Sequence, residues 1–396
     1  MRKFLWLLPV LLLLGSCGSR GDVDTLNVYN WGEYISDGSE GSLDVNKEFE
    51  QYYYETHGRR LKLNYTTYAS NEDMYNKLKS GGVSYDVVIP SDYMIEKMIA
   101  ENMLEKLDFS NIPNYRYIDE QYKYASYDPT NEYSVPYTCG CVGVIYNSSL
   151  ADIDTHDWDC LWDERYEGQI LQFNNPRDAF GTAMYALGID VNTTDESEWR
   201  RAMEYLKEQK PLVQSYVMDE IFNKMKNGSA AIAPYYAGDY LTMYEDNPDL
   251  EFFYPESGTN IFVDAMCIPT CAKNKSIAEE YINFCLSEDI AVANAEYICY
   301  ASPNILVKDN ETYIEDMNEI CENAIEILYP EGGIKSSYFK YLDVDTNAVQ
   351  NRLWEELKID NAVEAWVYVF AGLIAGGALL VMLYNFISRK QREKYY

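Results

Sequence analysis

The sequence predicts an α/β protein with two lobes, followed by a C-terminal transmembrane helix. Short β-branched runs alternate with segments of helical composition, which is typical of βαβ units around a largely parallel sheet. Roughly 340 residues separate an apolar segment near the N-terminus from a longer one near the C-terminus, and that length suits two domains. Lysines and arginines follow the longer apolar segment at once, as expected for a membrane-spanning helix.

The first half of the chain shows the alternation most clearly. Segment 44–56 carries Val45 and Phe49 at helical spacing, and Ser70 or Asn71 is placed to cap a helix with acidic residues in its first turn. A continuous β-branched run at 87–89 indicates a strand that is buried on both faces. In chain order we expect strands at 25–30, 61–68 and 87–89, and helices at 44–56, 70–78 and 92–101.

The second half predicts a second lobe. Residues 128–137 are turn-rich and then extended, so we place the first crossing between the lobes there, and 263–269 leads back. Strands are expected at 142–146 and 230–235, and helices at 177–187, 196–209, 276–286 and 348–357. The expected division is 26–137 with 265–305 for lobe 1, and 138–264 with 306–358 for lobe 2.

Aromatic and polar side chains follow several of the expected strands. Strand 87–89 stops at Pro90 and is followed by the hydroxyls of Ser91 and Tyr93. The first strand runs into Trp31 and Tyr34, strand 230–235 runs into Tyr236, and Phe262 and Asp264 stand together in a third such run. Ligands of open α/β sheets bind beyond the carboxyl ends of the strands. This pattern of rings and acids predicts a pocket for an organic cation.

The N-terminus has the features of a lipoprotein export signal. Arg2 and Lys3 precede a short apolar core, and small residues stand directly before Cys17. We expect residues 1–16 to be the signal peptide, Cys17 to be lipidated, and 17–24 to be a polar tether.

The C-terminal apolar segment, 363–387, is long enough to cross a bilayer, which needs about 20 apolar residues. The basic segment 388–396 is then expected in the cytoplasm, with the bulk of the chain outside. Two anchors in one chain favour the cell membrane of a single-membrane, Gram-positive type cell, because an outer membrane does not readily accept an apolar helix.

Charge and cysteine content restrict the partners. The net charge is −32, which argues against nucleic acid or an anionic membrane surface and permits a cationic ligand. Eight cysteines remain besides Cys17, and either disulfides or buried free thiols are possible. With only two histidines and no CxxC spacing, a zinc site is not expected, and no cofactor is expected.

Five motifs occur in an order that resembles one family. They are Asn30-Trp31-Gly32-Glu33-Tyr34; Tyr68-Ala69-Ser70-Asn71-Glu72 with Met74-Tyr75; Tyr85-Asp86-Val87-Val88-Ile89-Pro90-Ser91; Ser134-Val135-Pro136-Tyr137; and Tyr300-Ala301-Ser302-Pro303-Asn304. Over roughly 26–358 the chain is similar to the substrate-binding proteins of spermidine/putrescine ABC transporters. The resemblance implies a type II periplasmic-binding fold with a hinge, which closes on a polyamine in a cleft between its lobes and presents it to a membrane permease.

The resemblance also implies a set of ligand contacts. The family's acidic pair falls on Asn175 and Asp178, so one carboxylate is an amide here, and its second-lobe tryptophans fall on Tyr236 and Phe262. A late glutamine contact of the family has no counterpart at 338–343. The candidate ligand-binding residues are Trp31, Tyr34, Ser91, Tyr93, Asn175, Asp178, Tyr236, Asp239, Phe262, Asp264 and Tyr300.

Elementary physics supports the same ligand class. The rings can enclose an alkyl chain and attract its ammonium groups, by about 0.5–2 kcal/mol each when desolvated. An ammonium group that leaves water needs a carboxylate nearby, which Asp264 and Asp178 supply.

Other functions remain open at this point. The adjacent Tyr235 and Tyr236 suggest a ferric-ion binder of the same fold, although His57 is far from any strand end. An anion binder needs converging cationic groups, and Arg177 is the one candidate that stands out. An enzyme is not expected, because the chain lacks a Gly-x-Ser-x-Gly elbow, an HExxH motif and a P-loop.

Overall fold

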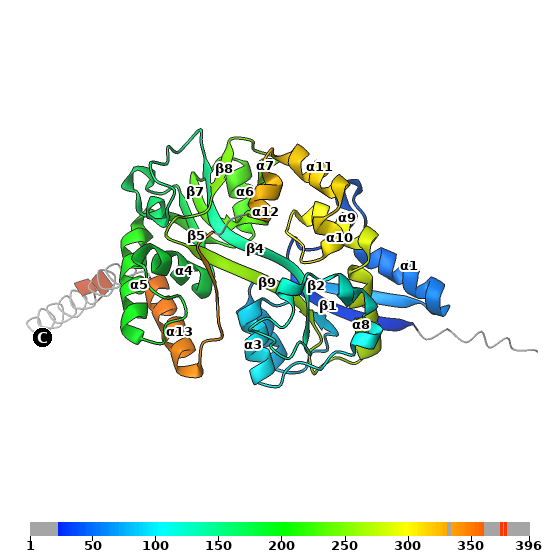
Figure 1. Ribbon diagram of the computed structural model, residues 1–396. Coiled ribbons are helices and arrows are strands. Elements are labelled where there is room, and N and C mark those ends of the chain that lie inside the picture. The colour runs from blue at the N-terminus through cyan, green and yellow to red at the C-terminus, as the bar shows by residue number, and fades with distance from the viewer. Residues whose placement is uncertain (1–22, 331–333, 360–372, 375, 378–396) are drawn as a thin grey trace, which may run out of the picture. The chain divides into compact units, whose positions relative to one another are not determined.

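The computed structural model describes residues 23–330, 334–359, 373–374 and 376–377, and Figure 1 shows their helices and strands. The expected signal peptide, Cys17 and the cytoplasmic tail lie outside these residues, as does all but four residues of the expected span at 363–387. Among the described residues, no helix combines the length and the apolar character needed to cross a membrane.

The chain forms two compact units. Met1–Cys139 and Val263–Ile325 belong to the first, and Gly140–Phe262 and Glu326–Tyr396 to the second. The strands β4 (Ser134–Asn147) and β9 (Thr259–Cys267) each begin in one unit and end in the other. The periplasmic-binding-type α/β architecture predicted from the sequence is therefore present as two units that are each made of discontinuous segments.

The first unit is built on a sheet whose central strand is β1 (Asp24–Trp31). Its neighbours β2 (Leu61–Tyr68) and β3 (Val87–Val88) are both parallel to it, as predicted, whereas β3 pairs with β9 in antiparallel fashion. The sheet is therefore mixed rather than purely parallel. The helices α1 (Val45–His57), α2 (Asn71–Lys79) and α3 (Asp92–Ala100) follow the three parallel strands in turn.

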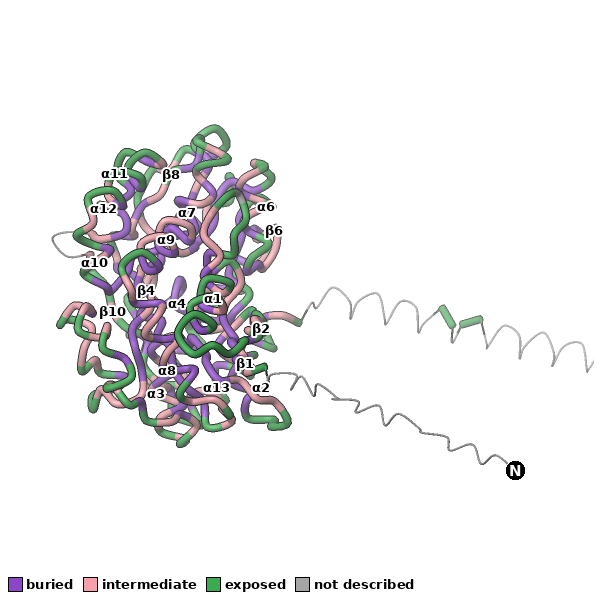
Figure 2. Tube along the Cα trace, turned by 90° about the vertical axis from the view of Figure 1, so that its right-hand side faces the viewer, coloured by how far each residue is buried: buried purple, intermediate pink, exposed green. Residues whose placement is uncertain are grey.

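Local chemistry explains where these helices begin. The Asp44 side chain accepts a hydrogen bond from the Lys47 N–H, and the Ser70 side chain accepts one from the Asp73 N–H, so both helices have the caps expected of these residue types. Helix α1 buries Val45, Phe49 and Tyr53 and exposes its other face, which is visible in Figure 2. The buried face packs into a core that includes Leu26, Val28, Val87, Met266 and Tyr281.

The later part of the first unit is helical. It contains α8 (Lys275–Cys285), α9 (Glu288–Ile298), α10 (Ile305–Lys308) and α11 (Glu311–Ile320). Segment 306–325 thus lies in the first unit and not in lobe 2, where it was expected. The reason is tertiary packing, because the buried Tyr313 of α11 donates a hydrogen bond to the Tyr300 carbonyl of this unit.

The second unit has its own mixed sheet. Strand β5 (Ile170–Phe173) is parallel to β6 (Val213–Val217) and β7 (Ile232–Tyr236), and β4 is antiparallel to β7 and to β8 (Leu250–Phe253). The short β10 (Ser336–Tyr338) pairs with the start of β9. The helices of this unit are α4 (Pro176–Leu187), α5 (Glu196–Gln209), α6 (Glu220–Lys226), α7 (Ala237–Tyr244) and α13 (Val344–Lys358), and α12 (Ala324–Leu328) begins at the boundary between the units.

The cysteines of the described residues are all free thiols. Seven of the eight are buried and Cys271 is half-buried. Burial raises the pKa of the Cys139 and Cys285 thiols to about 12, which keeps both in the neutral form. The eight cysteines therefore pack as small apolar side chains, the second of the two possibilities that the sequence left open.

Candidate functional site

A buried carboxylate lies at the centre of a cluster of candidate residues in the first unit. Asp264 is 4% exposed, and its Oδ2 accepts a hydrogen bond of 2.7 Å from the Tyr34 hydroxyl. The Tyr34 hydroxyl also pairs with Thr138 Oγ1, so Thr138 is the donor of that second bond because a hydroxyl has a single hydrogen. The Tyr300 ring meets the Tyr34 ring edge-on, with centroids 4.9 Å apart. These contacts join the candidate residue Tyr34 to the aspartate, and Tyr300 to Tyr34.

The structure corrects the expected position of Asp264. The residue lies inside β9 rather than after its end, and it belongs to the first unit rather than to lobe 2. A bridge of the antiparallel type pairs it with Ser91, and the Ala265 N–H donates to the Pro90 carbonyl at 3.1 Å. Asp264 is thereby held beside the segment that follows β3.

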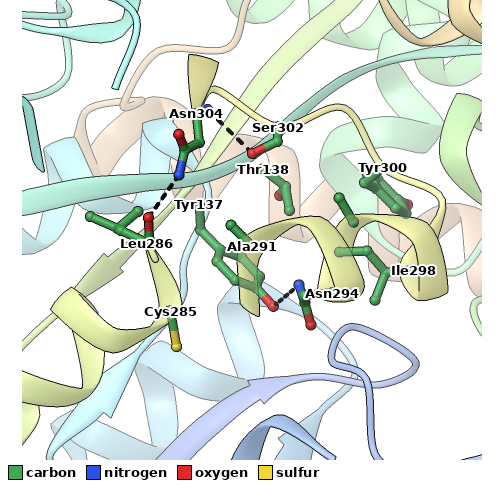
Figure 3. A pocket seen from close by; sticks show the side chains of 11 residues that line it. Tyr137, Thr138, Cys285, Leu286, Ala291, Asn294, Ile298, Tyr300, Ser302 and Asn304 are labelled. Atoms are coloured by element: carbon green, nitrogen blue, oxygen red, sulfur yellow. Dashed lines mark hydrogen bonds between the residues drawn. The ribbon is translucent and has the colours of Figure 1, made fainter. Parts of the chain in front are cut away.

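Tyr34 is fixed by hydrogen bonds from the half-buried Tyr137 and, through it, from the buried Asn294. The Tyr137 hydroxyl donates to the Tyr34 carbonyl oxygen at 2.8 Å, and it accepts a hydrogen bond of 2.8 Å from Asn294 Nδ2, as Figure 3 shows for the latter pair. The Asn294 side-chain oxygen accepts from the Ser36 N–H at 3.0 Å. Asn294 of α9 therefore restrains the backbone on both sides of Ile35.

The cavity drawn in Figure 3 measures about 20 Å³, which leaves room for one water molecule and is far too small for a polyamine.

Trp31 ends β1 and is half-buried. Its indole Nε1 donates to the Ile89 carbonyl at 2.9 Å, and its ring packs against Tyr68, with centroids 4.7 Å apart. The Tyr68 hydroxyl donates to the same carbonyl at 2.6 Å. The buried Tyr68 thus fixes the tryptophan ring at the end of the central strand.

Ser91 and Tyr93 are brought together by the side chain of Asn71, which is not among the candidate residues expected from the sequence. Asn71 Nδ2 donates to the Ser91 hydroxyl at 3.0 Å and to the Tyr93 hydroxyl at 3.1 Å, and its Oδ1 accepts from the Ser91 N–H at 3.2 Å. The Tyr93 hydroxyl in turn donates to Glu72 Oε1 at 3.1 Å. The signal for Asn71 and Glu72 was present, because both belong to the second of the five motifs.

A second cluster lies in the second unit, around Asp178. Asn175 is the N-cap of α4, where its Oδ1 accepts from the Asp178 N–H at 2.8 Å and its Nδ2 donates to Asp178 Oδ2 at 2.6 Å. The Tyr236 hydroxyl donates to the same carboxylate oxygen at 2.9 Å. The amide at position 175 is therefore a helix cap and a hydrogen-bond donor to the acid, a role that a second carboxylate could not fill in its ionised form.

Aromatic rings border this second cluster. Phe262 is 6% exposed and meets Tyr236 edge-on, with centroids 5.4 Å apart. A Cβ atom at Gly140 would come within 2.8 Å of Phe262 Cζ, so glycine is needed there for the ring to keep its place. Asp239 is buried in the first turn of α7.

Burial raises the pKa values of a candidate acid, Asp178, and of the phenol of Tyr235. Desolvation raises the pKa of Asp178 above its ordinary value, and the hydrogen bonds from Asn175 and Tyr236 act in the opposite direction. Burial also raises the pKa of Tyr235 far above its usual range, which disfavours the phenolate that a ferric ion requires. In the described part of the chain, no group of three or more histidine, cysteine, aspartate or glutamate residues is placed to hold a metal ion.

The other residues considered from sequence have structural partners. Arg177 donates to the Val191 carbonyl and to Asn192 Oδ1, both at 2.8 Å, and its guanidinium group lies over the Phe339 ring. His57 is exposed at the C-terminal end of α1, where its Nε2 lies 2.9 Å from Glu280 Oε1. Arg177 and His57 are thus used within their own units, which gives no support to the anion and ferric hypotheses.

The two units together define the class of the protein: a bacterial solute-binding protein with one acidic and aromatic cluster in each unit. The model of the bacterial extracellular solute-binding protein family matches residues 84–319. The chain belongs to this family, which binds solutes for transport and is not a family of enzymes.

Individual relatives are similar over most of their length. The spermidine/putrescine-binding periplasmic protein of Salmonella typhimurium is 36% identical over 351 residues, which cover 88% of this chain and 95% of the relative. The solved structure of the spermidine/putrescine ABC transporter substrate-binding protein of Streptococcus pneumoniae has a TM-score of 0.67 at 31% identity, covering 85% of this chain and 98% of that one. The structure of a lipoprotein of Treponema pallidum has a TM-score of 0.70 at 26% identity, covering 84% of this chain and all but 1% of the other.

Proposed function

We propose that this protein is the extracytoplasmic solute-binding component of a polyamine ABC importer, and that it delivers putrescine or spermidine to a membrane permease. The names of its relatives, which span binding proteins for spermidine and for putrescine, support this ligand class. In this proposal the clusters of both units contribute to binding. The rings contact the methylene chain, while Asp264 and Asp178 compensate ammonium groups.

One observation carries the proposal: a carboxylate, Asp264, is held almost fully out of water among phenol rings and hydroxyl groups. Burying a charge of this kind is costly unless an opposite charge or strong hydrogen bonds compensate it. A cationic ligand is the natural counterpart of such a group, and a polyamine also has the alkyl segments that suit the neighbouring rings.

Isothermal titration calorimetry on the purified full-length protein tests the function. We expect saturable binding of putrescine, spermidine or spermine, and no binding of a neutral diol of the same chain length. Ferric citrate serves as a second control for the alternative ligand class. Absence of binding to all three polyamines would overturn the proposal.

We further propose that two anchors hold the protein at the cell membrane. Lipidation of Cys17 after removal of residues 1–16 and a membrane-spanning helix at 363–387 follow from the sequence patterns, and one structural relative is itself described as a lipoprotein. In this proposal the tail 388–396 lies in the cytoplasm of a Gram-positive type cell. Fractionation tests this arrangement: a Cys17→Ala variant and a variant that ends after Lys358 should each stay with the membrane, and only their combination should be released.

A further inference from the structure

A glutamate, Glu72, accepts a hydrogen bond from one of the candidate ligand-binding hydroxyls in the first unit, that of Tyr93. Glu72 lies in the first turn of α2 and is half-buried, and its Oε1 accepts the hydrogen bond from the Tyr93 hydroxyl at 3.1 Å. The preceding residue, Asn71, binds the hydroxyls of both Ser91 and Tyr93. Asn71 therefore contacts both hydroxyls, and the adjacent Glu72 contacts that of Tyr93.

The hydrogen bonds of this group all point in one direction. Asn71 donates to Tyr93, and Tyr93 donates to Glu72, so the series ends on a carboxylate. Bonds that end on an ionised acceptor are the stronger kind, and the aligned dipoles add to the negative potential at the hydroxyl oxygens. Ser91, which Asn71 also binds, is paired with Asp264 across the β-bridge. Glu72 and Asp264 are thus linked by a short series of contacts within one unit.

The start of α2 does not depend on Glu72. The N-terminus of α2 is already capped by Ser70, whose side chain accepts from the Asp73 N–H at 3.1 Å, and the exposed Asp73 supplies a negative charge to the same helix end. Lys79 pairs with Glu101 at 2.8 Å, and Lys97, whose nitrogen lies 3.8 Å from the centre of the Tyr75 ring, is attracted by the charges of Glu101 and Glu72.

We propose that Glu72 determines specificity by supplying the negative charge for one ammonium group of a polyamine that contacts Ser91 and Tyr93. This inference rests on the proposed function and deepens it. Position 175 is a neutral amide, so Asp178 is left as the carboxylate of the Asn175–Asp178 pair. Glu72 would restore a charge on the other unit, and it should matter more for spermidine, with three amines, than for putrescine, with two.

The test compares Glu72→Gln with a matched control in the full-length protein. Glutamine keeps an oxygen that can accept from Tyr93 and removes only the charge. Glu101→Gln is the control, because Glu101 also accepts from a tyrosine hydroxyl, Tyr75 at 2.7 Å, and also carries one negative charge at the end of a neighbouring helix. We expect the Kd for spermidine to rise about tenfold or more in Glu72→Gln and to change less than about twofold in the control. The Kd for putrescine should rise by a smaller factor, and the salt dependence of spermidine binding should weaken.

A second comparison separates a direct charge from an effect through Tyr93. In a Tyr93→Phe background, Glu72→Gln should still weaken spermidine binding; no further loss in that background would mean that Glu72 only orients the tyrosine and would overturn the inference. A spermidine Kd in Glu72→Gln equal to that of the Glu101→Gln control would overturn it as well. Failure of the wild-type protein to bind any polyamine is a different result, which refutes the proposed function itself.

Discussion

Replacing Asp264 by asparagine should weaken polyamine binding and leave the stability of the ligand-free protein nearly unchanged. The substitution keeps an oxygen that can accept from the Tyr34 hydroxyl and removes the buried charge. Truncating one partner of a desolvated charge pair costs about 2–5 kcal/mol, and each 1.4 kcal/mol is a factor of ten, so the Kd for a polyamine should rise by about 30-fold to 4,000-fold. The 4% exposure of Asp264 places it in this desolvated class rather than among surface pairs, which are worth about 1 kcal/mol or less.

The stability of the ligand-free protein should change far less. A hydrogen bond to a charged acceptor is worth about 1 kcal/mol more than one to a neutral acceptor, and the variant also avoids the cost of burying a charge, so the two effects oppose each other. We expect the free energy of unfolding in urea to stay within about 1 kcal/mol of the wild type.

Asp86→Asn is the matched control for this variant. Asp86 is also fully buried in the first unit, but its carboxylate accepts 2.9 Å hydrogen bonds from the backbone N–H groups of Asn27, Lys273 and Asn274. We expect it to lose about 1–3 kcal/mol of stability and to keep the wild-type Kd once folded. An unchanged Kd in Asp264→Asn, measured by calorimetry, would refute the reasoning about the site.

Three further predictions concern both units. Asn175→Asp should tighten binding of spermidine more than that of putrescine because it adds a charge beside Asp178; equal effects on the two ligands in calorimetry would show that the position faces away from the ligand. Burial raises the pKa of Asp178 above 3.8, and a bound ammonium group favours the ionised form, so polyamine affinity should fall as the pH drops through this raised pKa. The ligand-free protein should gain stability over the same pH range, because the folded state binds the proton more tightly than the unfolded state. An Asp178→Asn variant whose affinity keeps the wild-type pH slope would contradict this. Tyr137→Phe removes the hydrogen bond to the Tyr34 carbonyl oxygen. We expect the Kd for a polyamine to rise up to about tenfold and the free energy of unfolding in urea to fall by about 1–2 kcal/mol. Wild-type values for both would show that this bond does not hold the backbone at Tyr34 in place.

Residue patterns predicted much of the first unit. The strand expected at 61–68 is β2 residue for residue, and of the two residues expected to cap the next helix, Ser70 or Asn71, Ser70 is the N-cap of α2. Both follow from short-range chemistry, since side-chain alternation and N-cap hydrogen bonds involve residues a few positions apart. Ser91 and Tyr93 were chosen as candidate residues from a similarly local pattern, because they come directly after the strand that was expected to stop at Pro90.

Pairings between distant segments could not be predicted in this way. The bond between Tyr34 and Asp264 joins residues 230 positions apart, and Asn71 meets Ser91 from a different helix. Thr138, which donates to Tyr34, lies in a strand with no feature that singles it out. The assignment of 306–325 to lobe 2 was wrong for the same reason, because helical periodicity shows which face of α11 is buried but not against which unit.

The amino-acid sequence by itself determined the α/β alternation, the starts of α1, α2 and α3 to within one residue, and the rings and acids that the candidate site draws on. Only the tertiary structure decided that Asp264 lies within β9 beside Ser91, that Tyr34 donates to it, and that Asn175 serves as a helix cap on Asp178. Local conformation is set by neighbours along the chain, whereas the environment of a buried charge is set by whichever distant segments the topology brings around it.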